Sequence, residues 1–366
     1  MLQLSVMKTK NIRVSIISRE SNEKTLDVAM LEEELLKRGV KVTVLSKLLT
    51  KDKSLKAIGY AGHVLRQEAA ILASDVVVLD TYCIPASMIP HRKGTAVIQM
   101  WHALGAVKKF GWQTVGKEGG SSEKVARLMK MHRGYDYIVS PSDITAEYFC
   151  EAFKAGRDKA VKYGLPRIDY IKSVASGSMH DELAGKILDK YPELKNGKKT
   201  VLYAPTFRRG KAVDVNSLTD AFDPEKYNIV VKLHPLYRGN DENVAEGRPN
   251  VIDDGVFSSY DWLSVADIII SDYSSFVIES ALADKPLYIY AYDLEDYEAN
   301  TGLNIDFTAE PVAAYVFSSA DELAAAAAED NYDFNALHAF RDRYIDINTE
   351  NCTAALADFI VSLAGC

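Results

Sequence analysis

Short apolar runs rich in β-branched residues alternate with helix-like segments along most of this 366-residue chain, and this alternation constrains the fold more than any other feature. In the first half, the strand-like runs lie at 12–17, 40–45, 75–80, 95–100 and 136–140. The helix-like segment 25–39 ends in Arg38 and Gly39, a common C-terminal signal. Strands that are apolar on both faces and separated by helices are typical of parallel sheets covered on both sides.

The second half of the chain repeats this scheme. Its strand-like runs lie at 200–204, 228–234, 250–253, 267–271 and 286–290. Because a chain of this length accommodates two domains, we predict an α/β fold of two Rossmann-like domains, residues 1–165 and 166–334. The linker is expected near 165–198, which is polar and rich in turn residues. The last segment, 335–366, reads as one or two helices that can pack back on the first domain.

Composition and charge restrict the class of protein. The chain is 48% hydrophobic and 26% charged, as is usual for a soluble globular protein. A formal net charge of -8 argues against a nucleic-acid binder, although it leaves room for a local basic pocket that takes a small phosphorylated ligand. No apolar run approaches the roughly 18–20 residues of a membrane span, so membrane contact is expected to be peripheral at most.

Cysteine usage and the N-terminal residues indicate a cytoplasmic location. The four cysteines are far apart and form no Cys-x-x-Cys pair, which is typical of reduced thiols. Lysine and arginine occur too early in the first residues for the apolar core of a secretory signal.

Polar side chains gather where the predicted strands end. In open parallel sheets, ligands bind beyond the carboxyl ends of the strands. Five strands are followed by phosphate-compatible or proton-transferring groups, which are His102; Ser140 and Ser142; Thr206 and Arg208; Lys232 and His234; and Asp272, Ser274 and Ser275. Two domains that face each other with these edges would enclose a central cleft.

The two histidines at strand ends are the sharpest candidates. Pro235 ends the strand directly after His234, so that the imidazole of His234 is left at the rim. Small residues follow His102, and Ala103 and Gly105 would let a ligand or another backbone approach closely. The alternative for each is a histidine with a purely structural role.

The other polar candidates also have two interpretations. Ser274 and Ser275 suit a helix N-cap, yet a helix N-terminus with free amides and hydroxyls is also an anion site. Glu279 can accept hydrogen bonds from a ribose or remain solvated. Arginine forks such as Arg208 match phosphate oxygens, and the alternative is a surface arginine pair. The histidines show no metal-ligand spacing, and there is no Walker-type glycine loop, so no metal site is expected.

Several stretches together resemble the motif series of the CDP-glycerol glycerophosphotransferase family, whose members make teichoic-acid-type polyol-phosphate polymers in bacteria. The matching stretches, in the order and approximate spacing of the family, are QMWHALGAVKKFG (99–111), LYAPTFR (202–208), VKLHP (231–235) and SDYSSFVIE (271–279). Residues 292–313 and 340–360 are similar to later elements of the family. The resemblance covers roughly residues 95 to 360.

The resemblance implies a GT-B-like fold and a phosphoryl transfer. The second half would hold a CDP-polyol, an acceptor hydroxyl would attack the phosphorus that bears the polyol, and CMP would leave. Two departures matter. The family's usual Trp-His-Gly is Trp-His-Ala at 101–103, which can alter acceptor fit. The long N-terminal region of some polymerising members is missing. The chain could therefore be a primase or a modifier of capsule or wall polysaccharide. The use of CDP-ribitol as donor is also open.

Roles can then be assigned to single residues. An attacking hydroxyl must lose its proton, and histidine, with an ordinary pKa of about 6.5, suits a general base. We therefore expect His102 to be the base, held by Trp101. We expect the growing charge on the phosphates to be stabilised by a group of cations and hydroxyls at strand ends, which are Lys108, Lys109, Arg208, Lys232, His234, Ser274 and Ser275. The remaining substrate-binding candidates are Ser140, Ser142, Thr206, Asp272 and Glu279. Lys108 and Lys109 can also be ordinary surface lysines.

The expected partners follow from this chemistry. They are CDP-glycerol or CDP-ribitol as donor, a lipid-linked saccharide or polyol-phosphate acceptor, no nucleic acid, and a peripheral contact with the inner membrane leaflet. No resident cofactor is expected, although Mg²⁺ can arrive with the substrate. Two other functions remain open, a GT-B glycosyltransferase that uses a nucleotide-sugar and a non-catalytic nucleotide-binding or assembly subunit.

Overall fold

The computed structural model describes residues 11–48, 56–117, 120–208, 212–233 and 244–364, with 56–60 described by their backbone alone. The chain divides into two compact units. Unit 1 comprises Met1–Leu104, Phe110–Asp169 and Asp346–Cys366, and unit 2 comprises Gly105–Lys109 and Tyr170–Ile345. The observed division thus falls a few residues after the boundary expected at 165.

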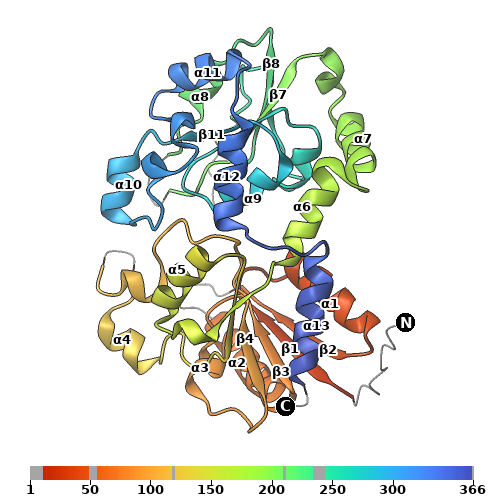
Figure 1. Ribbon diagram of the computed structural model, residues 1–366, viewed down its shortest axis with the longest axis vertical. Helices are drawn as coiled ribbons and strands as arrows, with labels where there is room; N and C mark the ends of the chain where they lie inside the picture. Colours follow the sequence, from red (N-terminus) through yellow and green to blue (C-terminus); the bar gives the residue numbers. More distant parts are fainter. Residues whose placement is uncertain (1–10, 49–55, 118–119, 209–211, 234–243, 365–366) are drawn as a thin grey trace. The chain divides into compact units, whose positions relative to one another are not determined.

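Unit 1 is built on a six-stranded parallel sheet of order β2-β1-β3-β4-β5-β6 (Figure 1). The strands are β1 (Arg13–Ser18), β2 (Lys41–Ser46), β3 (Val76–Leu79), β4 (Ala96–Gln99), β5 (Tyr137–Ser140) and β6 (Ala160–Lys162). The helices between them are α1 (Leu26–Lys37), α2 (Lys56–Ala73), α3 (Ile84–Met88), α4 (Glu123–Leu128) and α5 (Asp143–Phe153), with short 3-10 turns η1 (Gly111–Thr114) and η2 (Arg157–Lys159). All four residues of β3 are buried, as expected for a strand with helices on both faces.

Unit 2 contains a second six-stranded parallel sheet, of order β12-β11-β10-β7-β8-β9. The strands are β7 (Lys199–Tyr203), β8 (Tyr227–Val231), β9 (Val251–Asp253), β10 (Ile268–Ser271), β11 (Leu287–Tyr290) and β12 (Val316–Phe317). Its helices are α6 (Pro166–Ser176, which begins in unit 1), α7 (His180–Lys190), α8 (Asn216–Ala221), α9 (Phe276–Ser280), α10 (Leu294–Asn300), α11 (Ala320–Ala328) and α12 (Phe334–Tyr344). Short 3-10 turns are η3 (Pro192–Asn196), η5 (Asp261–Ser264), η6 (Ala281–Ala283), η7 (Phe307–Ala309) and η8 (Ala313–Tyr315). The predicted α/β fold with two parallel sheets is therefore confirmed.

The C-terminal segment is divided between the units. Helix α12 belongs to unit 2, whereas α13 (Cys352–Leu363) belongs to unit 1 and packs beside α1 (Figure 1). The carboxylate of Asp169 accepts hydrogen bonds from the backbone N–H groups of Cys352 and Thr353, at 2.9 and 2.7 Å. A carboxylate at a helix N-terminus satisfies otherwise unpaired N–H groups and opposes the helix dipole. These bonds tie the beginning of α13 to unit 1, so only the last part of 335–366 groups with the first domain.

Candidate active site

Trp101 lies in the loop that follows β4 and adopts an unusual backbone conformation. Its φ is +61°, in the left-handed region that non-glycine residues rarely enter. The surroundings hold it there. Its N–H donates to Oε1 of Gln99 at 2.9 Å, its ring stacks on Phe110 with centroids 4.5 Å apart, and it meets Phe153 edge-on at 5.2 Å. The indole is thus a fixed support for the next residue.

His102 is oriented by the end of β3 and by Trp101. Its Nδ1 lies 2.9 Å from the carbonyl oxygen of Asp80, and its ring centroid lies 4.2 Å from that of Trp101. Because a carbonyl oxygen only accepts hydrogen bonds, Nδ1 must carry the proton, and neutral His102 has its lone pair on Nε2. Oε1 of Glu20 lies 3.6 Å from Nδ1. About a third of the side chain is exposed, at 34%. Nε2 is therefore the ring nitrogen that is left available to a substrate.

Asp80, whose backbone carbonyl contacts His102, has a buried carboxyl group. Burial raises its pKa to about 7, the negative charge of Glu20 acts in the same direction, and the hydroxyls of Ser18 and Thr81 oppose the shift. Asp80 therefore titrates near neutral pH instead of in the usual range of a carboxyl group. Neither Asp80 nor Glu20 was among the predicted site residues.

Replacement of Asp80 by asparagine should flatten the dependence of stability on pH. Because the folded-state pKa is raised from 3.8 to about 7, the folded protein binds more protons than the unfolded chain in this window. The free energy of unfolding of the wild type should therefore fall as pH rises from about 4 to 7. Urea unfolding at several pH values measures this slope. An equal slope in wild type and Asp80→Asn would show that Asp80 does not titrate as described.

The segment Gly105–Lys109, which comes shortly after His102, belongs to unit 2. Lys108 forms an isolated antiparallel bridge with Leu303, and Lys109 donates its N–H to the carbonyl of Gly302 at 3.0 Å. The side-chain amide of Asn304 donates to the carbonyls of Ala106 and Lys108 at 2.9 and 3.2 Å. Unit 2 therefore begins at Gly105, only three residues after His102 in the chain.

Gly105 allows this segment to approach α9 closely. A β-carbon at this position would lie 2.1 Å from Cδ1 of Ile278, so a larger residue would force Ile278 to move. The predicted close approach at Gly105 is thus made to a side chain of unit 2.

Lys108 faces the charged cluster of unit 2. Burial lowers its pKa to about 8, the negative charge of Asp272 acts against this shift, and the positive charge of Arg208 adds to it. The side-chain ammonium group of Lys108 is therefore charged at neutral pH and loses its proton slightly above it. This buried environment differs from that of an ordinary surface lysine. The side chain of Lys109 packs against Gly302.

Arg208 is held by carboxylates of the protein itself. Its Nε and Nη2 donate to the two oxygens of Asp293 at 2.8 and 3.0 Å, and its Nη1 lies 2.9 Å from Oδ2 of Asp272. Nη1 also donates to the carbonyl of Thr206 at 3.0 Å. Burial alone would lower the pKa of Arg208, but the bonds to Asp293 and the charge of Asp272 raise it overall. The guanidinium thus organises the loop after β7, which differs from the phosphate contact predicted for it.

Thr206 and Lys232 lie at two neighbouring strand ends of unit 2. The backbone N–H of Thr206 donates to both oxygens of Asp272, at 2.9 and 3.0 Å. Its buried hydroxyl makes no hydrogen bond within the described part of the chain, which is unusual for a buried polar group. Lys232, in contrast, is buried and donates to the backbone carbonyl of Asp254 and to its carboxylate, at 3.2 Å for Oδ2. Thr206 is therefore the better placed of the two to receive a ligand.

The remaining predicted residues have different surroundings. Ser140 donates to the carbonyl of Ser142 at 2.9 Å, and Ser142 caps α5 by accepting from the N–H of Thr145 at 3.2 Å. The Ser142 hydroxyl is thus used as a helix cap, and the Ser140 hydroxyl is used in a bond to the backbone. His234 lies outside the described residues.

The serines of the SDYSS stretch lie at the beginning of the five-residue helix α9. Ser274 accepts from the N–H of Phe276 at 3.2 Å, whereas Ser275 occupies the N-cap position without a capping bond from its hydroxyl. Glu279 is buried, and its Oε2 accepts from the hydroxyl of Tyr260 at 2.6 Å. The solvated interpretation of Glu279 is therefore wrong, because packing within unit 2 removes the side chain from water.

The predicted residues thus form two groups, one in each unit. Unit 1 carries Trp101 and His102, and unit 2 carries a cluster around Asp272 that includes Thr206, Arg208 and Lys108. The rule that ligands bind at strand ends would also have found the missed residues Glu20 and Asp80, since Glu20 follows the strand-like run 12–17 and Asp80 ends the run 75–80. The partner of Arg208, Asp293, follows β11 in the same way.

The described residues contain neither a candidate metal site nor a candidate membrane span. No three or more His, Cys, Asp or Glu residues in that part of the chain are placed so that they could hold a metal ion. None of the helices described is both long and apolar enough to cross a membrane.

The chain thus has two parallel-sheet α/β units of the GT-B-like kind, one with an oriented histidine and one with a charged cluster at its strand ends. The sequence model of the family "CDP-Glycerol:Poly(glycerophosphate) glycerophosphotransferase" matches residues 1–362. The chain belongs to this family, which confirms the resemblance and the assignment as an enzyme that transfers polyol phosphates.

Individual relatives agree with this assignment. The chain is 32% identical to the teichoic acid ribitol-phosphate primase of Bacillus spizizenii over 88% of its own length and 84% of that protein. It is 28% identical to the teichoic acid glycerol-phosphate primase of Bacillus subtilis, over 82% of this chain and 77% of that protein. The wall teichoic acid polymerase TagF has the same fold, with a TM-score of 0.73 and 18% identity over 97% of this chain and 90% of that structure.

Proposed function

We propose that this enzyme transfers glycerol phosphate or ribitol phosphate from a CDP-polyol to a hydroxyl of a teichoic-acid, cell-wall or capsular acceptor and releases CMP. Relatives named for glycerol phosphate and for ribitol phosphate support both donors, and a histidine variant of TagF has been soaked with CDPG. The observation that carries the proposal is the orientation of His102, with Nδ1–H on a carbonyl and Nε2 available. We place the reaction at the cytoplasmic face of the cell membrane, where a lipid-linked acceptor would be found.

In the proposed reaction, Nε2 of His102 takes the proton of the acceptor hydroxyl as its oxygen attacks the phosphorus that bears the polyol. The bond between this phosphorus and the bridging oxygen breaks, and the electron pair leaves with CMP. The carbonyl of Asp80 holds the ring in place during this step, and the carboxylate of Glu20 lies 3.6 Å from Nδ1. Trp101 keeps the ring from rotating away, because the two rings are in contact.

Unit 2 supplies the groups that we propose for the donor. Lys108 and the hydroxyl of Thr206 are available to phosphate oxygens, and Ser275 adds a hydroxyl at the beginning of α9. His234, which follows β8 in the sequence, is proposed to stabilise the leaving phosphate when protonated. Fixed cations and donors of this kind lower the barrier by stabilising charge that develops in the transition state.

Donor binding should weaken as the pH rises through about 8. Because the pKa of Lys108 is lowered to about 8, its charge is present below this pH and lost above it. The KM for the CDP-polyol should therefore rise on the alkaline side in the wild type. Lys108→Arg keeps its charge and should show a flatter profile. Identical profiles for the two proteins would exclude Lys108 as a donor contact.

Mass spectrometry of reaction products tests the proposed function. The enzyme is incubated with CDP-glycerol, CDP-ribitol and nucleotide-sugars, each with lipid-linked saccharide and polyol-phosphate acceptors. The proposal predicts acceptors that gain one or more polyol phosphates. An acceptor that gains a sugar without phosphate would instead favour a GT-B glycosyltransferase, and donor binding without any product would favour a non-catalytic subunit.

A further inference from the structure

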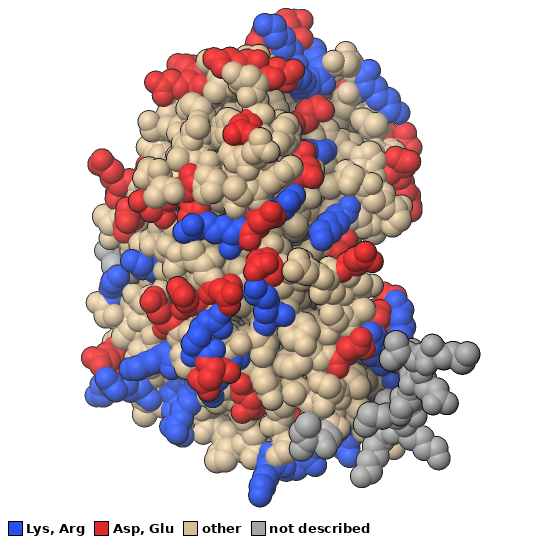
Figure 2. Space-filling view, in the orientation of Figure 1, with Lys and Arg blue, Asp and Glu red and all other residues tan. Residues whose placement is uncertain are grey.

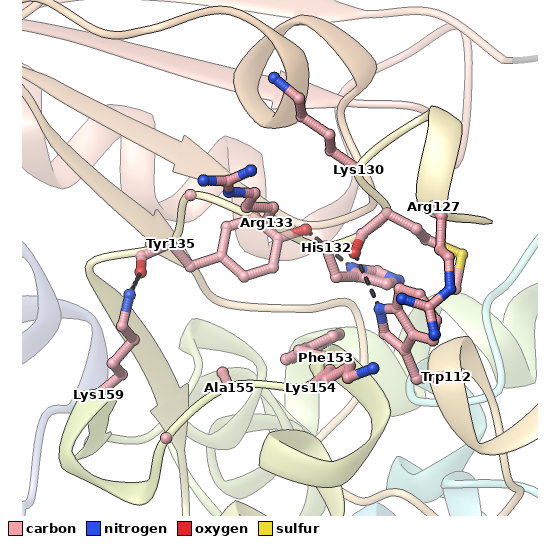
Figure 3. A pocket seen from close by; sticks show the side chains of 13 residues that line it. Trp112, Arg127, Lys130, His132, Arg133, Tyr135, Phe153, Lys154, Ala155 and Lys159 are labelled. Carbon is pink, nitrogen blue, oxygen red and sulfur yellow. Dashed lines mark hydrogen bonds between the residues drawn. The ribbon is translucent and has the colours of Figure 1, made fainter. Parts of the chain in front are cut away.

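A pocket of about 480 Å³ lies in unit 1, and none of the residues that line it is assigned to the reaction (Figure 3). Three segments build its wall: η1, the stretch between α4 and β5, and the stretch between α5 and β6. Four rings line it, those of Trp112, His132, Tyr135 and Phe153. Aromatic faces of this kind can cover the carbon atoms of a ligand.

The charge of the pocket is positive. Five cationic side chains line it, Arg127, Lys130, Arg133, Lys154 and Lys159, and no carboxylate does. Arg127 is paired with the exposed Glu123, while the other four form no ion pair within the described ranges. This local excess of positive charge contrasts with the net charge of -8 of the whole chain. Figure 2 shows Lys and Arg side chains gathered around α4 on the face in view, with acidic side chains among them. A local positive field attracts anionic ligands.

Trp112 is held in place with a cation over its face. The indole N–H donates to the carbonyl of Met131 at 3.0 Å, and Nζ of Lys154 lies 4.4 Å from the ring centroid. Figure 3 shows this ring among the side chains that line the pocket, which include Arg127 and Lys154. An aromatic plane with a cation over its face offers an apolar surface and a charged donor in one place.

His132 contributes to the pocket as a neutral ring. Burial lowers its pKa to about 3, and the charge of Arg19 adds to this effect. Its Nδ1 lies 2.9 Å from the hydroxyl of Tyr135. His132, Lys130 and Lys154 all have positive φ, at +58°, +46° and +53°. Such conformations persist only where surrounding structure enforces them, so the pocket wall is well defined by its packing.

The pocket is linked to His102 by one side chain. Trp101 contacts the ring of His102 and also meets Phe153 and His132 of the pocket, with centroid distances of 4.2, 5.2 and 6.0 Å. A ligand that fills the pocket therefore lies against rings that support the proposed catalytic base.

We propose that this pocket binds a phosphodiester group of a polyol-phosphate acceptor chain, at a distance from the hydroxyl that reacts. The identity of the chain rests on the proposed function, whereas the preference for a phosphate ester rests on the cations and rings of the pocket. Phosphodiester oxygens accept charge-assisted hydrogen bonds from Arg133 and Lys154, and the polyol carbons lie on Trp112.

Direct binding measurements with the full-length protein test the proposal. Soluble oligo(glycerol phosphate), glycerol 3-phosphate, inorganic phosphate, and vesicles with and without phosphatidylglycerol are titrated without any CDP-polyol. The test variant is Arg133→Glu with Lys154→Glu. Its matched control is Lys124→Glu with Lys172→Glu, which makes the same charge change at exposed lysines outside the pocket. All variants are checked for folding by circular dichroism and thermal unfolding.

The proposal predicts that the wild type binds the oligomer at least tenfold more tightly than inorganic phosphate. It also predicts that the pocket variant loses about tenfold or more of this affinity while the control changes little. In turnover, KM for the acceptor should rise in the pocket variant with KM for the CDP-polyol unchanged. Equal losses in both variants, equal affinity for inorganic phosphate, or binding to anionic vesicles alone would each overturn it. The binding measurement requires no turnover. A result that disproves ligand binding by the pocket can therefore be told apart from a result that disproves the proposed reaction.

Discussion

Replacement of His102 by alanine should lower turnover by about 10²–10⁴-fold, the usual cost of losing a general base. The affinity for CDP-polyol should change little, because we assign donor binding to unit 2. Single-turnover rates together with equilibrium binding of the CDP-polyol separate the two effects. Normal turnover in a folded His102→Ala protein would remove His102 from the mechanism.

A matched variant sharpens this test. Glu20→Gln leaves the ring and its bond to the carbonyl of Asp80 in place but removes the charge 3.6 Å from Nδ1. We expect a loss of rate much smaller than that of His102→Ala, because the ring and its support stay in place. A loss as large as that of His102→Ala would show that Glu20, and not the imidazole alone, is essential for the reaction.

Replacement of Arg208 by methionine should destabilise the protein by about 3–5 kcal/mol, as is typical when one partner of a buried ion pair is removed. The guanidinium is only 4% exposed, and its loss would leave the buried carboxylate of Asp272 and that of Asp293 without their cation. Denaturant unfolding measures the effect.

The control for this prediction is Arg248→Met. Arg248 pairs with Asp220 at 2.9 Å, but that carboxylate is largely exposed, so a change of only about 0–1 kcal/mol is expected. If Arg208→Met kept wild-type stability and instead lost affinity for the CDP-polyol, Arg208 would be a phosphate ligand, as the sequence alone suggested.

The parallel sheets were predictable because most of their strands are buried on both faces, although β2 is partly exposed. Such strands read as continuous apolar runs, and all ten predicted strands are present. β6 and β12 were missed, since they have three and two residues and are not fully buried. A strand this short has no periodicity from which it can be recognised.

The sequence positions of several site residues were predictable, but the side chains and backbone groups that they contact were not. Strand-end arguments found His102 and Asp272, because the sheet topology alone decides which residues reach that edge. They could not show that Arg208 is neutralised by Asp293, which lies 85 residues away in the sequence. Nor could they show that Lys108 joins unit 2, because this depends on backbone bonds to residues near 303.

The pocket around Trp112 illustrates a further limit of sequence reasoning. Its cations are spread over residues 127 to 159 and follow no periodic pattern. Only the folded chain brings Lys154 over the ring of Trp112.

If phosphorus is transferred together with the polyol, the nucleotide that is released must be CMP and not CDP. Chromatography of reactions with CDP-glycerol or CDP-ribitol and a matching acceptor can quantify CMP and CDP while mass spectrometry follows the acceptor. The account predicts one CMP for each polyol phosphate gained by the acceptor. Release of CDP, with polyol transferred but no phosphorus, would contradict it.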